Sequence, residues 1–98
     1  MSKLFTYGIL MDKNTMKYFN DEAKREDSYT LKGFKRVYAV NAYALPDKDS
    51  SITGVIYSGI TDWTTLDALE GVHYNHYKRV LLDEGFYIYL KGGDLFGR

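Results

Sequence analysis

The chain has 98 residues and no cysteine, and its 13 lysines and arginines balance 13 aspartates and glutamates. This composition lacks the basic surplus of nucleic-acid-binding proteins, and it excludes disulfides and thiolate nucleophiles. No apolar run approaches the roughly 18 residues of a membrane span, and the first residues lack a secretory hydrophobic region. We therefore expect a single cytoplasmic domain over residues 1–98 that contacts neither nucleic acid nor membrane.

The first quarter of the chain predicts one strand and one short helix. Residues 3–7 have strand-forming side chains, and Gly8 ends the strand. Residues 12–20 carry apolar side chains at helical spacing, and Asp12 is a suitable N-cap for them.

The middle of the chain predicts two further strands and a loop. Residues 28–44 are aromatic and β-branched, with an interruption at Gly33. They predict a strand, a bend at the glycine and a second strand over 37–43. The polar segment 46–51, which contains the single proline of the sequence, predicts a loop.

The second half predicts a helix over 63–70 with Asp62 as its N-cap and Gly71 as its stop. The turn 83–85 joins the last two strands of the chain as a hairpin. The three strands predicted in this half are 52–59, 76–82 and 86–91. Together the elements, with one or two helices among them, predict an α+β fold in which a helix packs against a small curved or barrel-like sheet.

Glu70 is a carboxylate on the apolar face of the second predicted helix. At 100° per residue its side chain falls between Leu66 and Trp63. Burial and the negative end of a helix both raise the pKa of a carboxyl group, toward proton exchange near neutral pH. Glu70 is therefore the candidate catalytic residue. The alternative is a structural carboxylate that reaches solvent or pairs with Lys78 or Arg79.

A candidate binding loop follows the first strand and comprises Tyr7, Gly8, Ile9 and Leu10. A glycine that leaves a strand lets successive backbone N–H groups point into one space, which suits a carboxylate or an oxyanion. The alternative is an ordinary tight turn. The loop is not a phosphate loop, because the GxxxxGK[ST] pattern is absent.

Two pairs of polar side chains follow the second predicted helix. Tyr77 and Arg79 are two apart on a strand and so share a face, from which they can approach Glu70 and a substrate carboxylate. The alternative is an exposed pair on the strand. His73 and His76 have no third metal ligand near them in the sequence. We therefore expect both to be surface residues of a loop and expect no metal site.

Four motifs, in this order along the chain, resemble those of the γ-glutamylcyclotransferase-like family. They are the YGxL-like loop Tyr7-Gly8-Ile9-Leu10, the GxxY-like strand Gly54-Val55-Ile56-Tyr57, the LDxxEG-like helix end Leu66-Asp67-Ala68-Leu69-Glu70-Gly71 and the YxR-like strand Tyr77-Lys78-Arg79. The resemblance implies a small mixed barrel with flanking helices. For the enzymes of the family it implies cyclisation of a γ-glutamyl group, which releases 5-oxoproline and an amine or amino acid.

The resemblance also implies roles for individual residues. Glu70 would take a proton from the α-amine of a γ-glutamyl substrate and return it to the leaving amine. The segment from Tyr7 to Leu10 would hold the substrate's α-carboxylate or carbonyl oxygen through backbone N–H groups. The chemistry implied needs no metal, cofactor or protein nucleophile.

The sequence also departs from the family pattern, because Ile9 stands where a serine or threonine is common and the chain is shorter than typical enzymes of the family. One alternative is therefore a non-enzymatic domain on the same fold that binds a small carboxylate or a peptide end. Another is a structural module that forms oligomers through its aromatic sheet face. The sequence does not indicate an oligomeric state.

Overall fold

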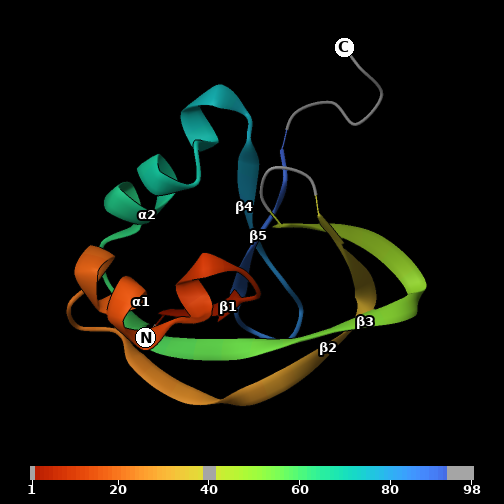
Figure 1. The fold of residues 1–98 in the computed structure, drawn as a ribbon, viewed down its shortest axis with the longest axis horizontal. Coiled ribbons are helices and arrows are strands. Elements are labelled where there is room, and N and C mark those ends of the chain that lie inside the picture. Colours follow the sequence, from red (N-terminus) through yellow and green to blue (C-terminus); the bar gives the residue numbers. More distant parts are fainter. Residues whose placement is uncertain (1, 39–41, 93–98) are drawn as a thin grey trace.

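The computed structural model describes residues 2–38 and 42–92. They form one mixed sheet of five strands in the order β2-β3-β1-β5-β4, with two α-helices and two short 3-10 turns (Figure 1). The elements are β1 (Ser2–Thr6), η1 (Ile9–Met11), α1 (Lys13–Phe19), β2 (Lys24–Tyr38), β3 (Ala42–Ile60), α2 (Trp63–Leu69), η2 (Val72–Tyr74), β4 (Tyr77–Leu81) and β5 (Tyr87–Lys91). The α+β architecture with a curved mixed sheet is confirmed, and the sheet is not closed.

The strands β2 and β3 form a long antiparallel ribbon that sweeps under the molecule and curls upward at one end (Figure 1). The loop predicted over 46–51 is wrong, because this segment lies inside β3. Pro46 pairs with Phe34, and the register shifts near Gly33, whose φ is +90°. A bulge of this kind tolerates proline in a strand, and the polar composition follows from the exposure of most of this segment.

The strand predicted over 37–43 is also wrong. Val37 lies at the end of β2 and pairs with Tyr43 at the start of β3. The predicted strand therefore consists of the ends of two different strands, which pair with each other. Residues 39–41 lie outside the described part of the chain. Sequence composition could not separate these alternatives, because both halves carry the same strand-forming side chains.

The central strand β1 supplies both faces of the core. Leu4 packs with the cluster that contains Leu66 of α2, and Phe5 packs with the opposite cluster, which contains Ile88 of β5. Successive strand residues point to opposite faces of a sheet, so two neighbouring residues anchor both layers. At Gly54 of β3 a Cβ atom would lie 2.2 Å from the Thr6 carbonyl oxygen, so glycine permits the close approach of β3 to β1.

Both helices begin at the predicted N-caps. Oδ2 of Asp12 accepts a hydrogen bond from the Thr15 N–H at 2.9 Å, and Oδ1 of Asp62 accepts one from the Thr65 N–H at 3.0 Å. The chain leaves α2 through Gly71, which has the left-handed φ of +69°. Asp62 and Gly71 therefore fix the two ends of α2. No helix within residues 2–38 and 42–92 is long and apolar enough to cross a membrane.

Candidate active site

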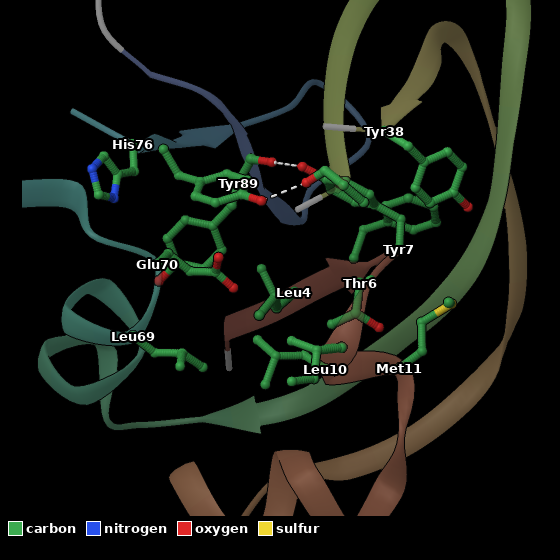
Figure 2. Close-up of a pocket in the computed structure, with 15 residues that line it drawn as sticks. Leu4, Thr6, Tyr7, Leu10, Met11, Tyr38, Leu69, Glu70, His76 and Tyr89 are labelled. Carbon is green, nitrogen blue, oxygen red and sulfur yellow. Dashed lines mark hydrogen bonds between the residues drawn. The ribbon is translucent and has the colours of Figure 1, made fainter. Parts of the chain in front are cut away.

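A cavity of about 540 Å³ lies between the turn after β1, the end of α2 and the sheet (Figure 2). Its wall contains six of the seven predicted site residues: Tyr7, Gly8, Ile9, Leu10, Glu70 and Tyr77. These residues come from three segments that are distant in the sequence. The fold therefore brings the candidate acid and the candidate binding loop to one space.

Glu70 is the C-cap of α2, and its backbone N–H donates to the Leu66 carbonyl at 3.0 Å. Figure 2 shows its side chain pointing from the end of the helix into the cavity. The two ion pairs of the described residues do not include Glu70, so it pairs with neither Lys78 nor Arg79. Burial raises the pKa of the Glu70 carboxyl from 4.5 to about 7. This carboxyl group can therefore exchange a proton near neutral pH.

Three tyrosines surround the carboxylate. The Tyr7 hydroxyl donates to the Tyr89 carbonyl, the Tyr77 hydroxyl donates to the Ala42 carbonyl at 2.5 Å, and the Tyr89 hydroxyl donates to Asp67 Oδ1 at 2.6 Å. Burial, with the charge of Glu70 as a further cause, raises the pKa of all three hydroxyls above the ordinary value. The phenols stay neutral, and because their protons are already donated, their oxygens have only acceptor capacity left.

The predicted binding loop folds into the 3-10 turn η1, with Gly8 as its N-cap. The first hydrogen bond of the turn runs from the Met11 N–H to the Gly8 carbonyl at 3.0 Å. The N–H groups of Ile9 and Leu10 precede this bond, so neither has an acceptor within the turn. The Leu10 side chain is buried in the core, whereas the Ile9 side chain is 68% exposed. The buried Leu10 side chain thus anchors the turn, and Gly8, Ile9 and Leu10 line the cavity.

Arg79 is not among the residues that line the cavity, so the structure does not bring it together with the other predicted site residues. Its guanidinium lies 4.4 Å from the centre of the Trp63 ring, and Nη2 is 3.7 Å from Asp67 Oδ2. Arg79 and Tyr77 do share a strand face, but α2 covers the position of Arg79 and leaves that of Tyr77 open to the cavity. Arg79 therefore joins β4 to α2.

The histidines provide no metal centre within the described chain. His73 and His76 are exposed, and no group of three or more His, Cys, Asp or Glu side chains in residues 2–38 and 42–92 could hold a metal ion. His76 lies at the cavity wall against Gly71, where a Cβ atom would lie 2.6 Å from Nδ1 of the imidazole. The predicted surface position of both histidines is confirmed.

Tyr38, Leu69 and Tyr89 are among the cavity residues that the sequence interpretation missed. Tyr89 pairs with Arg79 across the β4–β5 hairpin. A signal for it existed, because the predicted hairpin turn already places these two residues opposite each other. Tyr38 and Leu69 had no such signal, since their positions depend on the long β2–β3 ribbon and on the packing of α2.

The sequence of this chain matches a known protein family. The sequence profile of the family described as gamma-glutamyl cyclotransferase, AIG2-like, matches residues 4–91. Among curated protein sequences, none matches this chain.

Solved structures agree in fold. A structure named gamma-glutamyl cyclotransferase has a TM-score of 0.74 at 18% identity, covering 94% of this chain and 67% of that chain. An uncharacterized protein from Homo sapiens gives the same TM-score and coverage at 19% identity. An uncharacterized protein from Pyrococcus horikoshii gives 0.69 at 16% identity, covering 96% of this chain and 80% of that one. The chain belongs to the gamma-glutamyl cyclotransferase, AIG2-like family.

Proposed function

We propose that this protein cyclises a γ-glutamyl compound, releasing 5-oxoproline and an amine, with Glu70 as the general acid and base. The observation that carries the proposal is the position of Glu70. Its carboxylate has no ion-pair partner in the described chain, its pKa is raised to about 7, and it lines one cavity with the η1 turn. A general base is most effective when its pKa is near the working pH.

The reaction proceeds within one substrate molecule. The nitrogen of the α-amine attacks the γ-carbonyl carbon and closes a five-membered lactam, while the bond from that carbon to the leaving nitrogen breaks. Glu70 takes the proton that the attacking amine loses and delivers it to the departing amine. The protein contributes mainly by holding the amine against the carbonyl, since positioning of this kind supplies much of a rate enhancement.

The remaining walls suit the two ends of a γ-glutamyl group. The N–H groups of Ile9 and Leu10 can donate to the α-carboxylate or to the carbonyl oxygen as charge develops on it. The oxygens of Tyr7 and Tyr77 can accept from the α-amine, because their own protons are donated to backbone carbonyls.

The test is a panel of γ-glutamyl amides, amino acids and peptides offered to the purified protein, with 5-oxoproline measured. We expect at least one substrate to turn over, and we expect Glu70→Gln to lower kcat/KM by about 10²–10⁴, the range of general acid–base catalysis. Glu84→Gln is the matched control, because Glu84 is exposed in the β4–β5 turn. Product from no substrate, or equal product from Glu70→Gln, would overturn the proposal.

A binding domain on the same fold gives a different pattern of results. In that case small carboxylates would raise the Tm of the protein without turnover, and the shift would survive Glu70→Gln. Measuring Tm with the same panel therefore separates the two functions in one set of samples.

A further inference from the structure

A second cavity, of about 280 Å³, lies between α1 and the first residues of β2 (Figure 1). It shares no described lining residue with the cavity that contains Glu70. Four cations and one acid, Asp21, give its described wall a formal charge of +3, although the charges of the whole chain sum to zero. We call this cavity the cation recess, and its cations are Lys13, Lys17, Lys24 and Arg25.

Two elements bring these cations together. Lys13 and Lys17 are four residues apart on α1 and therefore lie on one side of this helix. Lys24 and Arg25 are the first two residues of β2. Only residues 20–23 separate the two elements, so both pairs of cations meet in one recess.

The cations of the recess have no counter-ion among residues 2–38 and 42–92, whose two ion pairs are Lys3–Glu26 and Arg79–Asp67. All four are exposed, so an anion can reach them without entering the core. Cations of one sign that line a concave surface raise the local concentration of anions. The recess is therefore suited to a ligand that carries more than one negative charge.

The inner wall of the recess is rigid. Tyr57 lines it and is buried in the core, and its hydroxyl donates to the Met11 carbonyl at 2.9 Å. This bond fixes the ring, and the exposed cations surround it. A small anionic group can therefore rest against a fixed wall while flexible side chains close on it.

We infer that the cation recess binds the phosphoryl group of a small phosphorylated compound. A phosphate monoester carries between one and two negative charges near neutral pH and has three strong acceptor oxygens. A guanidinium donates to two of these oxygens at once, and ammonium groups add point charges. A single carboxylate has one charge and would leave most of the charge of the recess unbalanced. The inference does not depend on the reaction proposed for Glu70.

Isothermal titration with three soluble probes tests the chemical class. Pyrophosphate and glycerol phosphate are the phosphoryl probes, and succinate is the carboxylate control. At low salt we expect pyrophosphate to bind about tenfold more tightly than succinate, with glycerol phosphate between them, because of the bidentate contacts of Arg25. The affinities should fall as salt is raised from about 20 to about 200 mM. Binding of neither phosphoryl probe, or equal binding of succinate, would overturn the inference.

Variants of opposite sign locate the bound anion. We expect Arg25→Gln to weaken pyrophosphate binding by about tenfold, and Asp21→Asn to strengthen it by about threefold, because Asp21 is the acid of the described wall. Lys48→Gln is the matched control, because it removes one exposed cation of β3 outside the recess, and we expect a change below about twofold. Equal losses in Arg25→Gln and Lys48→Gln, or no gain in Asp21→Asn, would overturn the inference. Tm measurements verify that each variant is folded.

Two further titrations distinguish other places and sources of the anion. Glu70→Gln should bind pyrophosphate within about twofold of the natural protein, because Glu70 does not line the recess. A larger change would place the anion in the Glu70 cavity and overturn the inference. Vesicles of phosphatidylcholine with phosphatidic acid present the phosphoryl group on a membrane. Binding to these vesicles without binding of the soluble probes would also overturn it, since the ligand inferred is a small soluble compound.

Discussion

Asp67 of α2 and Glu70, the C-cap of this helix, are carboxylates three residues apart, and their surroundings differ. Asp67 accepts a hydrogen bond from the Tyr89 hydroxyl at 2.6 Å and lies 3.7 Å from the Arg79 guanidinium. Glu70 has no ion pair among the described residues, and burial raises its pKa to about 7. The Asp67 carboxylate is therefore held by two partners, whereas the Glu70 carboxyl group, one turn later, can exchange a proton.

The difference indicates how the two positions depend on each other. Asp67 ties α2 to β5 through Tyr89 and to β4 through Arg79, whose guanidinium also lies over the Trp63 ring. These contacts hold the end of the helix against the sheet, and Glu70 faces the cavity with no ion-pair partner among residues 2–38 and 42–92. Replacing each acid by its amide should therefore change the protein in opposite directions.

The largest expected effect on stability comes from Glu70→Gln at pH 8. A pKa raised from 4.5 to about 7 means that ionised Glu70 costs up to about 3 kcal/mol in the folded protein. The amide removes the charge but still has to be buried, so we expect the free energy of unfolding to rise by about 1–3 kcal/mol. Urea denaturation of both proteins measures this change. A less stable variant would show that the Glu70 carboxylate has an unrecognised partner.

The pH dependence of the same pair sharpens the comparison. Between pH 4.5 and about 7 the folded protein binds the Glu70 proton more tightly than the unfolded chain does, so stability falls as pH rises. Below pH 4.5 both states are protonated, and well above pH 7 both are ionised. The stability of Glu70→Gln relative to the natural protein should therefore grow across this window and then level off. A constant difference would contradict the raised pKa.

Asp67→Asn should have the opposite sign. This change weakens the acceptor of the Tyr89 hydroxyl and leaves Arg79 without its counter-ion, and we expect a loss of about 1–2 kcal/mol in the free energy of unfolding. Asp83→Asn in the exposed hairpin turn serves as the control and should stay within about 0.5 kcal/mol. If Asp67→Asn is no less stable than this control, the proposed tie between α2 and the sheet is absent.

Tyr89→Phe should give the smallest effect. The ring remains in the core and the hydroxyl bond to Asp67 is lost, so we expect a cost of about 1 kcal/mol. Turnover of any substrate found should fall far less than in Glu70→Gln, because the Tyr89 hydroxyl is donated to Asp67. A loss of turnover as large as that of Glu70→Gln would show that the Tyr89 hydroxyl takes part in the reaction. It would contradict a purely structural role for the Asp67–Tyr89 pair.

The local features of this fold could be read from the sequence. The caps Asp12 and Asp62, the left-handed Gly71 and the hairpin turn 83–85 each follow from interactions within a few residues. The position of Glu70 on the inner side of α2 follows from helical periodicity, which also depends only on near neighbours.

Features that depend on distant pairing could not be read in this way. The segment 46–51 is polar and contains Pro46, yet it is a strand because β2 pairs with it. Likewise, Arg79 was expected near the substrate because it shares a face with Tyr77. Its contacts with Asp67 and Trp63 appear only when the packing of α2 on the sheet is known.

The most direct test of the central claim is a titration of Glu70 followed by NMR of its side-chain carboxyl carbon, with Glu70→Gln used to assign the signal. The claim is that this carboxyl group is partly buried, forms no ion pair with the described residues and exchanges a proton near neutral pH. The account predicts a midpoint near pH 7. A midpoint at or below 4.5 would show an exposed or paired carboxylate, and it would contradict the role assigned to Glu70.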